Sequence, residues 1–369
     1  MIVSLMNTTI MSKSICICFL LLTNLISLIV SEKGSLPLVI NTWPFTNATI
    51  AAWETIYHEG GSAVDAVERG CSQCEVDQCD GTVGWGGSPD ENGETTLDAM
   101  IMDATTHDIG AVGALRRVKQ AISVARKVME NTNHTLLVGD QATQFALSLG
   151  FHETSLTSDK SRKIQADWIN NSCQPNYWIN VNPDPMLQCG PYHLPQSDKL
   201  IKSNTIDNPN TIISSSESER GHDTIGMIVI DSNGLISTGT STNGLSHKIP
   251  GRVGDSPIPG AGAYAEKDVG AAAGTGDGDI AMRFAPAYQA VVNLKLGMSP
   301  TIAAKDAIER MANYFPNAML ALIVANNQGD FGAACNGIET FPFSVINPNQ
   351  SKVTVYRVNC TNPIKPSPH

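Results

Sequence analysis

The stretch Gly221-His222-Asp223-Thr224-Ile225-Gly226 places a hydroxyl residue directly after an acid and at the start of an apolar segment. That segment, residues 224–230, predicts a buried strand. The turn Asp231-Ser232-Asn233-Gly234 then leads into a second predicted strand over residues 235–241. The sequence therefore predicts a β-hairpin that begins at Thr224.

Cleavage of the peptide bond between Asp223 and Thr224 would make Thr224 the first residue of a new chain. Its free α-amino group would have a pKa of ~7.7 to 8.0 and could take the proton from the hydroxyl of the same residue. One residue would then serve as both nucleophile and base. The hydroxyl could also cause the cleavage, by attacking the Asp223 carbonyl to give an ester that water hydrolyses. The alternative is a threonine in an ordinary strand, which the motif alone favours.

The second strand of the hairpin carries Thr238, Thr240, Ser241 and Thr242 within five residues. Pairing of the two strands brings some of these hydroxyl groups near Thr224. One of them could orient the nucleophile.

A loop rich in glycine and proline, residues 244–262, contains Arg252 and Asp255. A guanidinium suits the α-carboxylate of an amino acid, and a carboxylate suits its α-ammonium group. The two side chains could therefore hold the two ends of an amino-acid substrate. A surface salt bridge between them is an equally good interpretation of their spacing.

The glycine cluster Gly274-Thr275-Gly276-Asp277-Gly278 does not fit a phosphate loop, because that motif requires a lysine. The order of its acids does not fit a calcium loop either. The Thr275 hydroxyl and the Gly276 backbone N–H could instead stabilise a tetrahedral intermediate. The alternative is a simple turn that leads into a helix.

The chain has 369 residues, enough for one large domain or two smaller ones. Its 24 Lys and Arg residues against 35 Asp and Glu residues give a net charge of −11, so we do not expect nucleic acid as a partner. No G-x-S-x-G motif supports a serine hydrolase. No spacing of His and carboxylates suggests a metal, and we expect neither a metal nor a cofactor.

The N-terminus predicts a secretory signal over residues 1–31, because Lys13 precedes an apolar run from Ile15 to Val30 and Ser31 is a small residue at a plausible cleavage point. The run is short and interrupted for a membrane span, which needs ~20 apolar residues. An uncleaved anchor is the alternative. After signal removal we expect no membrane association.

Secretion favours disulfides over a zinc site for the cysteines that remain. Nine cysteines less the two in the signal leave seven, so at least one is unpaired or pairs between chains. Cys74 with Cys79 and Cys173 with Cys189 would close short loops, and Cys335 with Cys360 would tie down the C-terminal segment. Four N-x-[ST] motifs predict glycan acceptors at Asn47, Asn133, Asn170 and Asn349; a fifth, at Asn359, competes with a disulfide at Cys360.

Residues 202–219 are rich in Ser, Thr, Asn and acids, which predicts a linker that divides the chain into two portions. Strands and helices in mixed order predict layers with buried sheets and helices outside. Besides the hairpin, we expect strands over residues 36–43, 97–103, 319–325 and 330–334 and helices over 49–58, 62–75 with Ser62 as N-cap, 117–130, 140–150 capped by Asp140, 279–296, and one beginning at Ser299 and Pro300.

Four ordered motifs together resemble the aspartylglucosaminidase (glycosylasparaginase) family of N-terminal nucleophile hydrolases. They are residues 221–226, Gly239-Thr240-Ser241-Thr242-Asn243-Gly244, Gly251-Arg252-Val253-Gly254-Asp255-Ser256-Pro257 and residues 274–279. The likeness extends over nearly the whole mature chain, including Asn41-Thr42-Trp43-Pro44-Phe45 and Asp80-Gly81-Thr82-Val83-Gly84.

The resemblance implies an α+β fold, a four-layer αββα sandwich, in a chain that cuts itself between Asp223 and Thr224. It implies an α chain of residues 32–223 and a β chain of residues 224–369, which form one domain and assemble as an (αβ)2 heterotetramer. It further implies a lysosomal amidohydrolase that cleaves the N-acetylglucosamine–asparagine bond of degraded glycoproteins.

The resemblance also implies a role for each site residue. Thr224 resembles the nucleophile and Thr242 the hydroxyl beside it. Arg252 and Asp255 resemble the substrate clamp, and Thr275 with Gly276 the oxyanion pair. Trp43 resembles a pocket-lining tryptophan and Asn47 a family glycan position. The three disulfides above match the family's pairings and leave Cys71 unpaired.

Two other functions remain open. An L-asparaginase or isoaspartyl peptidase of the same fold would use the same threonine and the same clamp. A secreted binding protein without activity could also use this scaffold, with Thr224 in a structural role.

Overall fold

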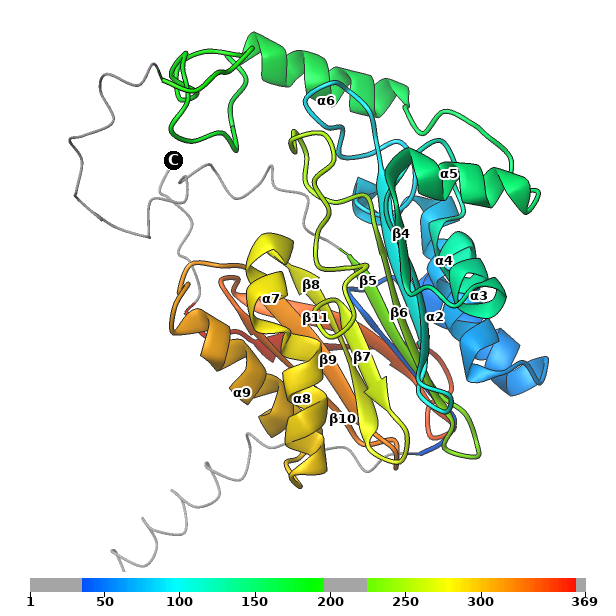
Figure 1. The fold of residues 1–369 in the computed structure, drawn as a ribbon. Coiled ribbons are helices and arrows are strands. Elements are labelled where there is room, and N and C mark those ends of the chain that lie inside the picture. Colours follow the sequence, from blue (N-terminus) through cyan, green and yellow to red (C-terminus); the bar gives the residue numbers. More distant parts are fainter. Residues whose placement is uncertain (1–34, 196–223, 363–369) are drawn as a thin grey trace, which may run out of the picture.

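The computed structural model describes residues 35–195 and 224–362 (Figure 1). The predicted signal over residues 1–31, the predicted linker over 202–219 and Asp223 lie outside the described residues. Among the described residues, no helix combines the length and apolar character needed to cross a membrane.

The described residues form a mixed α and β fold with two sheets. The larger sheet has eight strands in the order β12-β11-β1-β5-β6-β2-β3-β4. These strands are β1 (Leu38–Thr42), β2 (Leu97–Asp103), β3 (Asp108–Leu115), β4 (Leu136–Val138), β5 (Ile225–Ile230), β6 (Ile236–Thr242), β11 (Thr340–Ile346) and β12 (Thr354–Asn359). The smaller sheet has the order β10-β9-β8-β7 and consists of β7 (Ala263–Glu266), β8 (Gly270–Gly276), β9 (Leu320–Asn326) and β10 (Phe331–Asn336).

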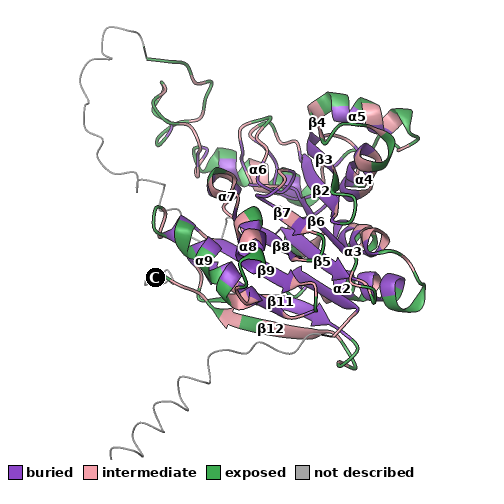
Figure 2. Cartoon of the chain, turned by 60° about the horizontal axis from the view of Figure 1, so that its bottom comes forward, coloured by how far each residue is buried: buried purple, intermediate pink, exposed green. Residues whose placement is uncertain are grey.

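The predicted hairpin is confirmed and lies at the centre of the larger sheet. Strands β5 and β6 pair antiparallel from Ile225 opposite Ser241 to Ile230 opposite Ile236. Strand β1 pairs with the other edge of β5, and β2 pairs with the other edge of β6. All residues of β5 and β6 are buried, because sheet or helix covers both faces (Figure 2). Thr224 therefore lies immediately before a strand in the most enclosed part of the sheet.

The two sheets contact each other through β5 and β6 on one side and β7 and β8 on the other. Small residues permit a close approach: a Cβ added to Gly226 would lie 2.9 Å from the Cβ of Ala273. Helices α2 (Thr46–Trp53), α3 (Ala63–Asp77) and α4 (Ala121–Asn131) pack against strands of the larger sheet, and α8 (Pro286–Lys295) and α9 (Pro300–Ala312) pack against the smaller one (Figure 1).

Several helix boundaries differ from the prediction. The helix expected over residues 49–58 begins at Thr46 and ends in a π-helical segment, Glu54–His58. The helix expected from residue 117 begins at Ala121. Asp140 is not a cap, because it lies inside α5 (Gly139–Ser148) and Val138 is the N-cap. Ser62 does cap α3, in a capping box with Asp65.

The helix predicted over residues 279–296 is two helices. Helix α7 (Gly278–Phe284) ends at Ala285, whose φ of 50° is left-handed, and α8 starts at Pro286. The break follows from Pro286, because a proline ring disfavours the α conformation of the residue before it. The glycine cluster does lead into a helix, as predicted: Asp277 is the N-cap of α7 and Gly278 its first residue. Its first three residues, Gly274–Gly276, end strand β8, which was not predicted.

The sequence did not predict six further elements of the fold: strands β3, β4, β7, β11 and β12 and helix α6 (Asp159–Asn170). Strand β3 shows one reason, because its glycines read as breakers in a sequence. A Cβ at Gly110 would lie 2.0 Å from the carbonyl oxygen of Ala125 in α4, so glycine permits the contact between strand and helix.

Three disulfides are present, Cys74–Cys79, Cys173–Cys189 and Cys335–Cys360, as expected. Cys71 is a buried free thiol. The predicted glycan acceptors Asn47, Asn133, Asn170 and Asn349 are all exposed, so each is sterically open to a glycan.

Candidate active site

Thr224 lies immediately before β5, with 5% of its surface exposed. The ladder between β1 and β5 runs from Leu38 opposite Ile230 to Asn41 opposite Met227. Beyond the end of this ladder, the Thr42 hydroxyl makes the hydrogen bonds to the strand. It donates to the Thr224 carbonyl oxygen at 2.6 Å and accepts from the Gly226 N–H at 2.9 Å. A side chain of β1 thus fixes the backbone of Thr224 at the end of its strand.

The backbone nitrogen of Thr224 is held from the other sheet. It donates to the hydroxyl oxygen of Thr275 in β8 at 3.0 Å, and the Trp43 indole N–H donates to the same oxygen at 3.1 Å. Trp43 is 9% exposed, and its ring packs edge-on against Phe341 at 5.2 Å between centroids. The atom that would become the α-amine therefore already has a fixed position beside Thr275.

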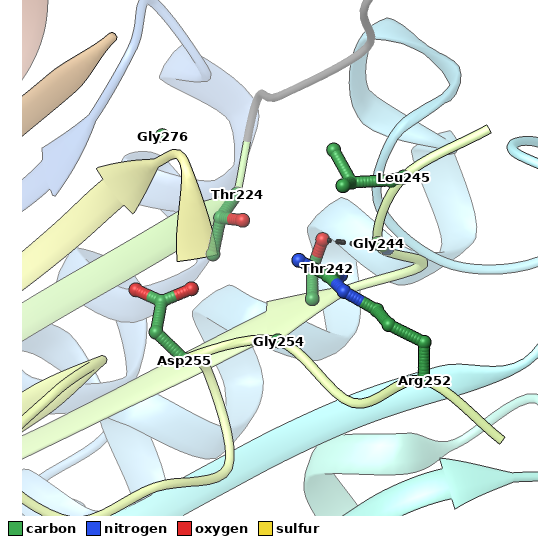
Figure 3. Close-up of a pocket in the computed structure, with 8 residues that line it drawn as sticks. All are labelled: Thr224, Thr242, Gly244, Leu245, Arg252, Gly254, Asp255 and Gly276. Carbon is green, nitrogen blue, oxygen red and sulfur yellow. Dashed lines mark hydrogen bonds between the residues drawn. The ribbon is translucent and has the colours of Figure 1, made fainter. Parts of the chain in front are cut away.

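A pocket opens next to Thr224 (Figure 3). Its lining residues are Thr224, Thr242, Gly244, Leu245, Arg252, Gly254, Asp255 and Gly276. In the figure the Thr242 hydroxyl and the Arg252 guanidinium lie on one side of Thr224, and the Asp255 carboxylate lies on the other. The predicted residues Thr224, Thr242, Arg252, Asp255 and Gly276 thus come together in one place.

Of the four hydroxyl residues that the sequence placed near Thr224, Thr242 lines the pocket. Its hydroxyl accepts from the Gly244 N–H at 3.0 Å and donates to the Thr82 carbonyl oxygen at 3.3 Å. The other three bind elsewhere: Thr238 to the Met227 carbonyl, Thr240 to the Ser256 carbonyl and Ser241 to the Glu75 carboxylate. Thr242 is therefore the one of these four hydroxyl residues that shares the pocket with Thr224.

Arg252 and Asp255 do not form the surface salt bridge that their spacing allowed. Arg252, whose side chain is 14% exposed, pairs instead with Asp279 at 2.8 Å. Burial is the largest influence and would lower the Arg252 pKa, but the charge and hydrogen bond of Asp279, together with the charges of Asp98 and Asp255, outweigh it and the pKa is raised. The guanidinium stays charged at the pocket.

Asp255 is 5% exposed, and burial raises its pKa to about 6 against the opposing pull of Arg252. A buried carboxylate that lacks a full ion pair is well suited to a cationic ligand group, because the ligand supplies the missing charge. The loop thus presents one cation and one acid to the pocket.

Gly276 and Trp43 occupy different places relative to the pocket. Gly276 lines it with a φ of 125°, and a Cβ there would lie 2.2 Å from the Met319 carbonyl oxygen, so glycine is required. Trp43 is not one of the lining residues; it reaches the pocket through Thr275. Its role in lining the substrate pocket stays a prediction.

The asparaginase family model matches residues 22–355 of the chain. The chain belongs to the asparaginase family. It is 55% identical over 346 residues to the N(4)-(beta-N-acetylglucosaminyl)-L-asparaginase of Rattus norvegicus, covering 93% of this chain and 97% of that protein. The Mus musculus protein of the same name is 54% identical over 335 residues, 90% of this chain and 94% of its own. A putative enzyme of this name from Drosophila melanogaster is 51% identical over 318 residues, 85% of this chain and 79% of its own.

Sequence reasoning missed several residues of this asparaginase-family site. Thr42, Thr82 and Asp98 lie far from Thr224 in the sequence and reach the site through hydrogen bonds to its backbone or to Thr242. Thr42 and Thr82 do belong to motifs that carry the family resemblance, and that was the available signal. Lys248 is 2% exposed and donates to the Asn243 carbonyl oxygen at 2.6 Å; nothing in its sequence context distinguishes it from a surface lysine.

Proposed function

We propose that this protein is an N4-(β-N-acetylglucosaminyl)-L-asparaginase, an amidohydrolase that cleaves the bond between N-acetylglucosamine and the asparagine side chain. One observation carries the proposal: Thr224 immediately precedes a buried central strand, its backbone nitrogen donates to the Thr275 hydroxyl, and the residue lines a pocket together with Arg252 and Asp255. The names of the rat and mouse relatives support the same activity.

In the proposed reaction, the α-amine of Thr224 takes the proton from the Thr224 hydroxyl, and the oxygen attacks the side-chain amide carbon of the substrate. The negative charge that develops on the amide oxygen is stabilised by the Thr275 hydroxyl and the Gly276 N–H. The C–N bond then breaks, and the proton leaves with the glycosylamine. Water hydrolyses the remaining aspartyl ester, which releases L-aspartate and restores Thr224.

Arg252 and Asp255 would hold the substrate by its α-carboxylate and α-ammonium groups. Both groups are charged in free asparagine derivatives and neutralised in a peptide chain, so this clamp favours substrates whose protein has already been degraded. Thr242 would orient the nucleophile. We expect neither a metal nor a cofactor to take part.

The mechanism needs a free α-amine, and we propose that the chain cuts itself between Asp223 and Thr224. The products would be an α chain of residues 32–223 and a β chain of residues 224–369. Contacts of helices with both sheets, and of the sheets with each other, support a four-layer αββα sandwich built from both chains. We further propose an (αβ)2 heterotetramer in the lysosome, reached through the predicted signal of residues 1–31.

The processing step is tested with purified protein on a denaturing gel and by N-terminal sequencing. We expect two fragments, one of which begins at Thr224. Thr224→Ala should abolish both processing and hydrolysis, while Thr224→Ser should retain part of each because the hydroxyl survives. An uncleaved chain with full activity would contradict the mechanism, as would a Thr224→Ala variant that is processed and active.

An L-asparaginase or isoaspartyl peptidase activity is the second candidate, because the clamp contacts the amino-acid part of the substrate. Rates on glucosaminyl-asparagine, asparagine and β-aspartyl dipeptides separate the two. The proposal requires the highest kcat/KM for glucosaminyl-asparagine. Equal or higher values for the other substrates would reassign the function within the family.

A further inference from the structure

Asp98 contacts two parts of the pocket lining, the strand that carries Thr242 and the loop that carries Gly254 and Asp255. It lies in β2, directly opposite Thr242 in the ladder between β2 and β6. Side chains of directly opposed residues in antiparallel strands point to the same face of the sheet. The Asp98 carboxylate therefore lies on the same face as the Thr242 hydroxyl, and the residue is 3% exposed.

The carboxylate binds the backbone of the clamp loop. Its Oδ2 accepts from the Gly254 N–H at 3.1 Å, and its Oδ1 accepts from the Ala114 N–H at 2.7 Å. Gly254 lines the pocket and immediately precedes Asp255. The hydrogen bond from Ala114 in β3 holds the carboxylate in place, so its second oxygen can hold the Gly254 backbone.

A purely electrostatic role for Asp98 is the competing interpretation. Lys248 is a buried cation, and the negative charges of Asp98, Asp90 and Glu94 all act on it. Asp90 offers a comparison, because it is also 3% exposed and also accepts two backbone N–H groups. Those groups belong to Asn92 and Glu94, in its own turn and outside the pocket lining. Both acids act on Lys248, but the charge of Asp98 acts on Arg252 and Asp255 as well, and the two acids differ in what they hold. Asp98→Glu, which keeps the charge, therefore separates positioning from the charge effect on the clamp.

We propose that Asp98 is a positioning residue that sets the distance between the strand of Thr242 and the clamp formed by Arg252 and Asp255. The inference rests on the proposed function, because it assigns the clamp to an amino-acid substrate. This role of Asp98 would also explain how the clamp keeps its position relative to the strand of Thr242 after the chain is cleaved. Asp98 lies before the expected cleavage point and Gly254 after it, so their hydrogen bond would join the α chain to the β chain.

The test compares two substrates in wild-type protein and in Asp98→Asn. One is glucosaminyl-asparagine; the other is its succinamic analogue, which keeps the α-carboxylate and lacks the α-amino group. An asparagine side chain has the same volume, but it has one acceptor oxygen and no charge. It therefore cannot accept from both the Ala114 and the Gly254 N–H groups, and we expect Gly254 and the adjoining Asp255 to shift. We expect kcat/KM for glucosaminyl-asparagine to fall about 10- to 100-fold, mostly through KM, and that for the analogue to change less than about threefold.

Asp90→Asn is the matched control, and we expect its kcat/KM for both substrates to stay within about twofold of wild type. Equal losses in Asp98→Asn and Asp90→Asn would overturn the proposal in favour of a charge effect on Lys248. Equal losses on the two substrates in Asp98→Asn would overturn it as well, because a general structural defect does not discriminate between them.

Folding of each variant is read from its processing into two chains. If Asp98→Asn is not processed, Asp98→Glu replaces it, because that variant keeps the charge and moves the carboxylate by one methylene group. The same selective loss on glucosaminyl-asparagine supports positioning, and wild-type kinetics in Asp98→Glu overturn it. Failure of the proposed function is separate: wild-type protein would then not hydrolyse glucosaminyl-asparagine at all.

Discussion

Replacement of Asp255 by asparagine should make the protein more stable and less active. Asp255 is buried, and its pKa is raised to about 6, mainly by burial. An aspartate in the unfolded chain has a pKa of ~3.9. Between these two values the folded protein binds more protons than the unfolded chain, so the contribution of Asp255 to stability decreases as the pH rises from about 4 to about 6. Above that range the ionised carboxylate is a fixed cost to the fold.

The size of the cost follows from the pKa difference. A shift of about 2 pH units corresponds to about 3 kcal/mol at ~1.4 kcal/mol per unit. Asparagine carries no charge at any of these pH values and therefore avoids the cost. Arg252 is not left unpaired by the change, because its ion pair is with Asp279. For a chain of this size, about 3 kcal/mol corresponds to a rise in Tm of about 4 °C.

The assay is thermal unfolding of wild-type protein and Asp255→Asn at pH 4, 5, 6 and 7, with kcat/KM measured on glucosaminyl-asparagine. We expect the Tm difference to be largest at pH 7 and close to zero at pH 4, where Asp255 is protonated in wild type. Activity should fall at least about 100-fold, because the clamp loses its partner for the ammonium group. Asp108→Asn, at an exposed position, controls for loss of a charge and should leave Tm nearly unchanged at every pH.

Two results would refute this reasoning. A lower Tm for Asp255→Asn at pH 7 would mean that the ionised carboxylate stabilises the fold. A Tm difference that does not depend on pH would mean that packing, not ionisation, accounts for the effect.

Two further predictions concern the Thr275 side of the pocket. Trp43→Phe removes the N–H that binds the Thr275 hydroxyl while an aromatic ring remains against Phe341, so kcat should fall about 3- to 10-fold with normal processing; an unchanged kcat in steady-state assays would exclude a role for this hydrogen bond. Gly276→Ala would place a Cβ 2.2 Å from the Met319 carbonyl oxygen at a φ of 125°, so the end of β8 must move. We expect kcat/KM to fall about 100-fold or more and Tm to decrease, and a variant with wild-type values for both would contradict the assigned geometry.

The parts of the fold that follow from local rules were predictable. The β5–β6 hairpin needs only an apolar segment, a turn of suitable residues and a second strand, and the structure has it where the sequence predicted it. The split between α7 and α8 also had a local signal in Pro286, which the prediction overlooked. Strand β3 had none, because Gly110 is explained only by its contact with α4.

The sequence by itself determined which chemical groups are available. A threonine that begins an apolar strand, the hydroxyl-rich strand after it, and a loop with one arginine and one aspartate can all be read from neighbouring residues. These features depend on spacing along the chain, and the pocket does contain Thr224, Thr242, Arg252 and Asp255.

Only the tertiary structure decided which partners those groups have. Arg252 pairs with Asp279 and not with the nearer Asp255, and Asp98 reaches Gly254 across 156 positions of sequence. Such contacts arise where two sheets and their loops pack together, and their energies depend on burial and distance, which no local pattern encodes. The same packing encloses Asp255 and raises its pKa, so the charge state of the clamp is a property of the folded molecule.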